Sequence, residues 1–127
     1  GGGVTPEELK KRTKAYAINA IRLGDSLPNT RSGNIVANQF IRSATSVGAN
    51  YRAACRARSD ADFASKIGVT LEEADESVFW MEIVAESGMK PAQQITPLLK
   101  EGNELVAILI ASSNTVRNRL GKNSKSK

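Results

Sequence analysis

Arginines on one side of a predicted helix are the residues of this sequence with the clearest chemistry. Arg42, Arg52 and Arg56 fall within an arc of roughly 80°, since each residue of a helix turns by about 100°. Arg58 follows at the helix end. Guanidinium groups make forked contacts with phosphate, so the arc predicts a surface that binds a polyanion. The alternative is that these arginines form ion pairs with acids of the next helix. Those acids are Glu72, Glu73 and Glu76.

A second basic cluster lies near the start of the chain and contains Lys10, Lys11, Arg12 and Lys14. These side chains would attract phosphate without regard to nucleotide sequence and with a strong dependence on salt. A solvated helix face is the alternative for the same residues. The lysines of residues 121–127 would act in the same way as the cluster.

The net charge of +5 is unevenly distributed along the chain. Residues 1–60 contain ten Lys or Arg and four Asp or Glu, a balance of +6. Residues 61–127 contain eight and nine, a balance of −1. Either the first half presents a surface to a polyanion, or the two halves attract each other on folding. Composition leaves both interpretations open.

The sequence contains no histidine. This excludes histidine-dependent acid–base catalysis, Ser-His-Asp and Cys-His arrangements, and histidine-ligated metals. The acidic run of Glu72, Glu73, Asp75 and Glu76 offers ligands that hard cations accept. Its members wrap around the helix, however, and no second acidic cluster with suitable spacing faces them. Cys55 falls on an apolar stripe, where we expect buried packing rather than a reactive thiol. We therefore expect no enzyme activity, no cofactor and no metal.

Trp80 is the aromatic residue best placed for a surface role, because it falls just beside an apolar stripe. RNA-binding faces often stack bases on exposed aromatics, and Trp is also enriched in subunit interfaces. We expect Trp80 at the edge of the core or in an oligomer interface. Tyr16 and Tyr51 fall on core stripes.

Asn50 is a polar residue near the crowded side of its helix, with Ser43 and Ser46 one or two turns earlier. A buried amide must find hydrogen-bond partners. We expect Asn50 to form a bond that sets the register of the helices, either inside the fold or across an oligomer interface.

Helices must position these side chains, because apolar residues recur at intervals of three and four in four segments. The first segment starts at Thr5 as N-cap, with Pro6 at the first helical position, and ends before Pro28. The second opens around residues 32–34. Its expected inward stripe consists of Ala37, Ile41, Ala44, Gly48, Tyr51 and Cys55, and Phe40, Val47 and Ala54 are expected to widen it.

The third segment opens at the N-cap Ser59 and stops near Gly88. The fourth runs from about Pro91 to Leu120. Pro97 is expected to kink or restart this helix, with Thr96 as a new cap.

Four amphipathic helices with short connections predict an all-α, antiparallel up-and-down four-helix bundle. We place the bundle at residues 5–120. Residues 1–4 are expected to be disordered or left over from cloning, and residues 121–127 to form a disordered basic tail. No apolar run is long enough to cross a bilayer. The first residues lack the basic segment followed by an apolar segment that is typical of a signal peptide. We therefore expect a cytoplasmic protein.

The segment Asn38–Ala54, NQFIRSATSVGANYRAA, resembles the signature of the small four-helix bundle protein family, also called ribosomal intervening-sequence proteins. Its most specific part is RSATSVGAN, Arg42–Asn50. Phe63–Gly88 is similar to the third helix of that family and Glu104–Leu109 to the last. The family often has an acidic segment after this asparagine, whereas this chain continues with the basic segment Tyr51–Arg58. This departure favours polyanion binding.

The resemblance implies a four-helix bundle that assembles as a ring-like homopentamer with a basic surface, and no established catalytic activity comes with it. Related accessory proteins of diversity-generating retroelements bind nucleic acid and a reverse transcriptase. The resemblance thus implies nucleic acid, with RNA favoured, and a reverse transcriptase-like protein as partners.

Two hypotheses follow for the function. The first is a homo-oligomeric, pentameric protein that binds RNA or a nucleoprotein complex through its basic surface. The second is a protein-interaction scaffold without a nucleic-acid role, in which the arginines form internal ion pairs. An enzyme or metal carrier is disfavoured by the missing histidines. The residues expected to bind nucleic acid are Arg42, Arg52, Arg56, Arg58, Lys10, Lys11 and Lys14.

Overall fold

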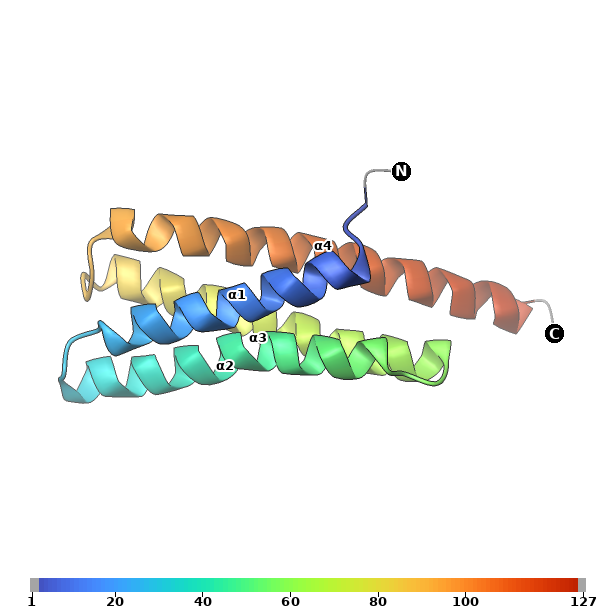
Figure 1. Cartoon of the computed structure of the whole chain (residues 1–127), viewed down its shortest axis with the longest axis horizontal. Helices are drawn as coiled ribbons and strands as arrows, with labels where there is room; N and C mark the ends of the chain where they lie inside the picture. Colours follow the sequence, from blue (N-terminus) through green and yellow to red (C-terminus); the bar gives the residue numbers. More distant parts are fainter. Residues whose placement is uncertain (1–2, 126–127) are drawn as a thin grey trace.

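The computed structural model describes residues 3–125, which form four helices. These are α1 (Pro6–Asp25), α2 (Arg31–Cys55), α3 (Asp60–Glu86) and α4 (Ala92–Lys125). Consecutive helices lie side by side and antiparallel, joined by short connections (Figure 1). The described residues contain no strand. The all-α, up-and-down four-helix bundle expected from the sequence is confirmed.

Side chains before the first three helices cap them. The hydroxyls of Thr5, Thr30 and Ser59 each accept a hydrogen bond from a backbone N–H three residues later, at 3.0–3.1 Å. Such caps satisfy N–H groups that have no partner inside the helix. Thr5 and Ser59 are the caps expected from the sequence. α2 begins at Arg31, slightly before the expected residues 32–34, and Thr30 caps it.

The inward face of α2 is rotated from the expected stripe. Its centre lies on Val36, Phe40, Val47 and Ala54, all of which are buried. Ala44 and Tyr51 of the expected stripe are buried with them, whereas its other members are only partly buried: Ala37, Ile41, Gly48 and Cys55. A side-chain carbon at Gly48 would lie 3.4 Å from the Thr13 carbonyl oxygen, so the glycine marks a close approach of α1 and α2.

α1 and α3 lie diagonally across the bundle, since each packs against α2 but not against the other's backbone. Their buried side chains still meet in the core, where the Tyr16 hydroxyl lies 2.7 Å from Ser77 Oγ. The inward sides of α1 and α3 are therefore fixed by Tyr16 and Ser77.

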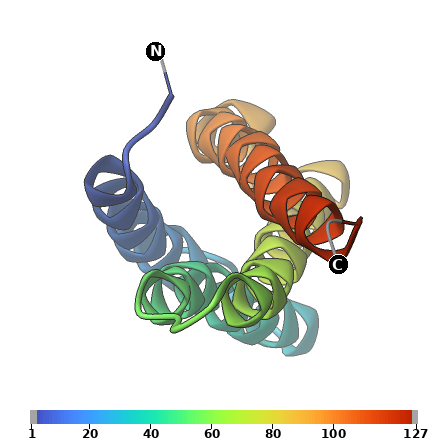
Figure 2. The ribbon, with the colours of Figure 1, turned by 90° about the vertical axis from the view of Figure 1, so that its right-hand side faces the viewer.

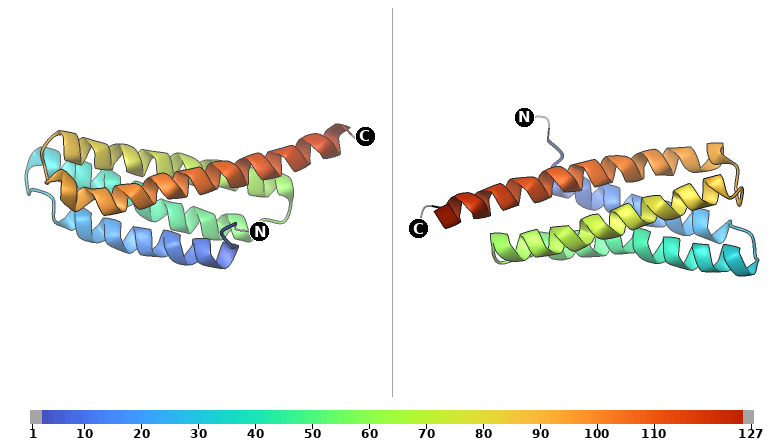
Figure 3. Two further views of the ribbon diagram at one scale, coloured as in Figure 1. Left: turned by 90° about the horizontal axis from the view of Figure 1, so that it is seen from above. Right: turned by 180° about the vertical axis from the view of Figure 1, so that it is seen from behind.

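The bundle is open between its first and last helices. α1 and α4 pack against each other much less than the other neighbouring pairs. Viewed end-on, the helices form an open arc with α1 and α4 at its two ends (Figure 2). The C-terminal part of α4 projects beyond the α2–α3 connection (Figure 3).

Some boundaries differ from those expected. α4 runs through Pro97 without restarting, and the Thr96 hydroxyl donates to the Ala92 carbonyl instead of capping a new helix. α4 also continues past Leu120 to Lys125, because a single Gly121 costs only about 1 kcal/mol in a helix that is already formed. Residues 126–127 of the expected tail lie outside the described residues.

Of the expected N-terminal segment, Gly1 and Gly2 also lie outside the described residues. Val4 is half-buried and packs against the core. Gly88 has a positive φ of 77° after the end of α3, as expected for a glycine that stops a helix. In the part of the chain that the structure describes, no helix is long and apolar enough to span a membrane.

Candidate nucleic-acid interface

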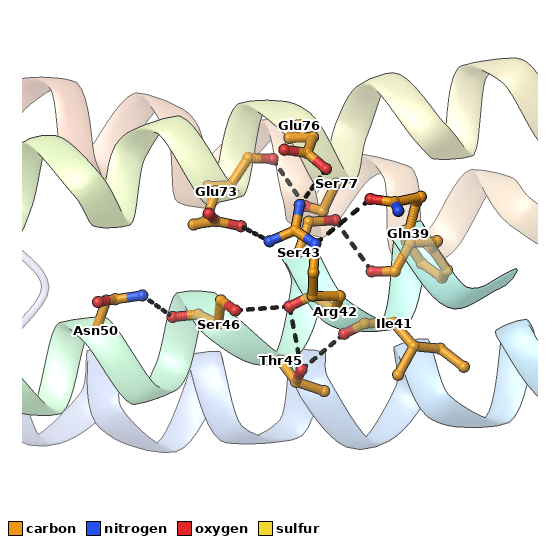
Figure 4. Close-up of polar contacts among 12 residues, drawn as sticks. Gln39, Ile41, Arg42, Ser43, Thr45, Ser46, Asn50, Glu73, Glu76 and Ser77 are labelled. Carbon is orange, nitrogen blue, oxygen red and sulfur yellow. Dashed lines mark hydrogen bonds and ion pairs between the residues drawn. The ribbon is translucent and has the colours of Figure 1, made fainter. Parts of the chain in front are cut away.

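Arg42 forms ion pairs within the subunit. Its guanidinium group donates to the carboxylates of Glu73, at 3.1 Å, and Glu76 (Figure 4). It also donates to the side-chain oxygen of Gln39 at 3.4 Å. The hydrogen bond with Glu76 raises the pKa of Arg42. Of the two interpretations of the arginine arc, internal ion pairing holds for Arg42, although Glu72 is not among its partners.

Arg52 and Arg56 are placed differently. Both are exposed, and neither takes part in an ion pair among the described residues. α2 ends at Cys55, so Arg56 is its C-cap rather than a residue of its last turn. The two side chains of the arc nearest the helix end are thus available for a polyanion.

Arg58 lies in the α2–α3 connection, exposed and without an ion pair within the described chain. It is close to the start of α3. The pKa of Asp62 is lowered chiefly by a hydrogen bond from Lys66, and further by the backbone N–H and the charge of Arg58. Arg58 therefore lies close enough to Asp62 to stabilise the charged form of its carboxyl group.

The basic cluster of α1 is divided between two sides of the helix. Arg12 turns toward α4 and donates to the carboxylates of Glu101 and Glu104, and the hydrogen bond with Glu101 raises its pKa. Lys10 pairs with Glu7 of its own helix at 3.3 Å. The remaining two lysines, Lys11 and Lys14, are exposed and have no ion-pair partner in residues 3–125.

Lysines of α1 and arginines of α2 meet on one face. Thr13 lies against Gly48, and α1 and α2 run antiparallel. Three residues back along α1, Lys10 therefore lies near the level of Arg52. Lys14 lies about one turn to one side of this level and Arg56 about one turn to the other. We call Lys10, Lys14, Arg52 and Arg56 the α1–α2 basic face.

Acidic residues are scarce around the α1–α2 basic face. No Asp or Glu occurs between Asp25 and Asp60, a run that includes all of α2. The acids of the second half of the chain lie on α3 and α4, where Glu73, Glu76, Glu101 and Glu104 pair with Arg42 and Arg12. The charge asymmetry of the sequence therefore has two outcomes. Some basic residues hold the halves together, and others remain on the surface. The acid-free run does not separate the two groups, because it contains the paired Arg42 as well as Arg52.

Trp80 lies at the edge of the core, one of the two positions expected for it. It is half-buried, and its indole N–H donates to Glu76 at 3.1 Å. The exposed aromatic is its neighbour Phe79, which is 50% exposed and meets the Trp80 ring edge-on at 5.1 Å. Phe79 was missed because its place opposite the buried residues of α3 becomes clear only once the inward side of α3 is known.

Asn50 does not set the register inside the bundle. Its amide donates to the Ser46 carbonyl at 2.8 Å, one turn earlier in the same helix (Figure 4). Ser43 and Ser46 likewise donate to carbonyls of α2 itself. The buried hydrogen bond between helices is made instead by Tyr16 and Ser77, both on stripes of otherwise apolar residues.

A groove of about 1040 Å³ lies at the open end of the bundle, between the start of α1 and the second half of α4. Cys55 lines it and is half-buried rather than fully packed in the core. Tyr51 beside it is buried, and burial raises its pKa. In residues 3–125, no three acidic or cysteine side chains are grouped so as to hold a metal ion.

Comparison with known proteins supports the resemblance noted in the sequence. Residues 7–111 match the family described as 23S rRNA-intervening sequence protein. A crystal structure of a protein of unknown function from the S23 ribosomal protein family of Bacteroides thetaiotaomicron has a similar fold. Its TM-score is 0.79 at 28% identity, over 86% of this chain and 97% of that one. No curated protein sequence matches. The match covers most of the chain and the fold agrees, so this protein belongs to the 23S rRNA-intervening sequence protein family.

Proposed function

We propose that this protein binds RNA as a homo-oligomer, without catalysing a reaction, and that RNA phosphates contact the α1–α2 basic face. The observation that carries this proposal is the exposed pair Arg52 and Arg56, which has no acidic partner in the described chain. Lys14 adds positive charge on the neighbouring helix, where the charge of Lys10 is partly offset by Glu7. The family description names a ribosomal RNA, which supports RNA as the polyanion.

The proposed contact is electrostatic and does not read bases. The aromatic residues of α1 and α2 are Tyr16, Phe40 and Tyr51, and all three are buried. The α1–α2 basic face therefore offers no aromatic ring on which a base could stack. Arginine and lysine bound to phosphate release counterions from the nucleic acid, so affinity should fall steeply as salt is added.

The test is RNA binding at several salt concentrations, measured with single-stranded and duplex RNA of one length. Arg52→Glu combined with Arg56→Glu should abolish binding at low salt. Lys100→Glu combined with Lys122→Glu is the matched control, because it changes the net charge equally on exposed residues of α4. Circular dichroism should show the same helicity for both variants. Affinity that does not depend on salt, or equal loss in both variants, would reject the α1–α2 basic face.

The homo-oligomer is tested by the mass of the nuclease-treated protein in solution. The family resemblance leads us to expect five copies. A scaffold without a nucleic-acid role would instead show no affinity for RNA at low salt and would retain a protein partner after nuclease treatment.

A further inference from the structure

The outward side of α1 presents apolar and basic side chains together. Ile18 and Ile21 are 43% and 42% exposed. Lys11 lies seven residues before Ile18 and Arg22 four residues after it, spacings that place all of them on one side of a helix. Lys11 and Arg22 are exposed, with no ion pair in the described chain. We call these four residues the α1 stripe.

The outward side of α3 presents an apolar residue among acids. Phe79 is 50% exposed. Acids surround it at intervals of three and four residues, and all of them are exposed. The described ion pairs of α3 involve other acids and leave these carboxylates unneutralised. The α3 stripe consists of Glu72, Asp75, Phe79, Glu82 and Glu86.

The two stripes point to opposite sides of the molecule. Tyr16 and Ser77 mark the inward sides of the diagonal helices α1 and α3, since their hydroxyls meet in the core. Ile18 follows Tyr16 by two residues, and Phe79 follows Ser77 by two. Two residues turn a helix by about 200°, so both side chains point away from the bundle axis, in opposite directions.

We propose that copies of this chain assemble head to tail, with the α1 stripe of one copy packed against the α3 stripe of the next. This inference rests on the homo-oligomer of the proposed function and names its contact surfaces. The partner of each stripe is a second copy of this chain, because the two stripes are complementary in apolar character and in charge. Each has an exposed apolar centre, and their charges are opposite.

The same charges disfavour a twofold dimer. A symmetric contact would place α1 against α1, bringing Lys11 and Arg22 near their own kind, or α3 against α3, bringing carboxylates together. Like charges in close contact oppose association. A head-to-tail contact pairs opposite charges and leaves one free stripe at each end. A ring closes only where each contact also turns the next copy toward the first.

Charge reversal tests the contact directly. The α1 variant carries Lys11→Glu and Arg22→Glu. The α3 variant carries Asp75→Lys and Glu82→Lys together with Glu72→Gln and Glu86→Gln, so that its α3 stripe becomes positively charged. Each variant alone should assemble only at a concentration about tenfold or more above that of the wild type, because its two stripes then carry like charge. An equal mixture of the two variants should associate more strongly than either variant alone, since each contact between unlike copies again pairs opposite charges. A ring of five copies keeps one contact between like copies. A chain with both sets of substitutions should recover assembly fully, because every contact then pairs opposite charges.

The measurement is mass in solution after nuclease treatment, at low salt, with thermal melting to show that each variant is folded. Lys100→Glu combined with Lys122→Glu should assemble like the wild type. Variants that assemble normally, or a mixture that stays as dissociated as its components, would overturn the head-to-tail contact.

Substitution of the apolar residue at the centre of each stripe tests the contact independently of charge. Phe79→Ser or Ile18→Ser should weaken assembly by about tenfold or more, because large buried anchors dominate interface energies. Ile110→Ser is the matched control, since Ile110 is 45% exposed on α4, outside both stripes. Equal weakening by Ile110→Ser would contradict the proposal.

Failure of this inference can be told apart from failure of the proposed function. A wild-type protein that is monomeric at all concentrations would reject the homo-oligomer and the contact together. An oligomer that none of these substitutions affects would reject only the contact. RNA binding is measured separately with the Arg52 and Arg56 variant, which leaves both stripes unchanged.

Discussion

The Tyr16 hydroxyl of α1 donates a hydrogen bond to Ser77 Oγ of α3 across 2.7 Å, directly beside Gly102 of α4. Tyr16 is the donor because the Ser77 hydroxyl is itself donated to the Ala74 carbonyl. A side-chain carbon at Gly102 would lie 2.8 Å from the Tyr16 hydroxyl oxygen. Three helices thus meet at one polar point in the core, and the glycine provides the space for it.

Gly102→Ala should destabilise the fold. The added methyl would also come within 3.0 Å of Val78 Cγ2 and 3.1 Å of Met81 Cε, which are packed in the core. Overpacking of this kind costs about 1–3 kcal/mol, more than the helix propensity gained from alanine. Thermal or denaturant unfolding measures the difference.

Gly68→Ala is the control for that substitution, because nothing lies within 4 Å of the position that its methyl would take. It should stabilise the protein by up to about 1 kcal/mol through helix propensity alone. Equal effects of the two alanines would mean that the space beside Tyr16 does not constrain α4.

Tyr16 should make the fold sensitive to alkali. Burial, the largest cause, raises its pKa from 10.0 to about 12. The unfolded chain therefore loses this proton at lower pH than the folded one. The stability is fully present below pH 10 and decreases as the pH rises toward 12, by an amount on the order of 2 kcal/mol.

Tyr16→Phe should remove that part of the alkaline decrease and also lose one hydrogen bond, which costs about 1 kcal/mol at neutral pH. Ser77 keeps a partner in the Ala74 carbonyl, so no buried hydroxyl is stranded. Unfolding free energies of both proteins between pH 8 and 12 provide the comparison. Parallel pH profiles would contradict the assignment.

Gly33→Ala should disturb the connection between α1 and α2. A side-chain carbon there would lie 2.0 Å from the Pro28 carbonyl oxygen, which is backbone and has little freedom to move. We expect a loss of about 1–3 kcal/mol, as for other overpacked sites, with helicity retained. A melting temperature equal to that of the wild type would show that the turn has another conformation of similar energy.

The fold follows from local signals in the sequence. The caps Thr5 and Ser59, the stop at Gly88 and the 3- and 4-residue spacing of apolar residues all depend on neighbours along the chain. The rotation of α2 could not be predicted in this way. The stripe of Phe40 and Val47 lies beside the stripe of Ile41 and Gly48, and the packing of α1 against Gly48 turns the first stripe inward.

The candidate site was predicted less completely, because its residues depend on contacts between helices. Arg42 and Arg52 have the same chemistry and lie on the same helix. They differ in that Arg42 pairs with Glu73 and Glu76 of α3, whereas Arg52 forms no ion pair among the described residues. Helical spacing shows that two residues share a face of one helix, but it does not show what the next helix presents to that face.

This difference leads to the last prediction. Arg52→Gln should weaken RNA binding and reduce the slope of log affinity against log salt by about 1, as expected for one lost phosphate contact. Arg42→Gln should leave both quantities unchanged, because its charge is already neutralised by Glu73 and Glu76. The two substitutions remove the same charge from the same helix, so they differ only in the surroundings of the arginine. An equal effect on the slope would mean that RNA draws Arg42 away from its carboxylates, and the surface that binds RNA would then extend across α2 to α3.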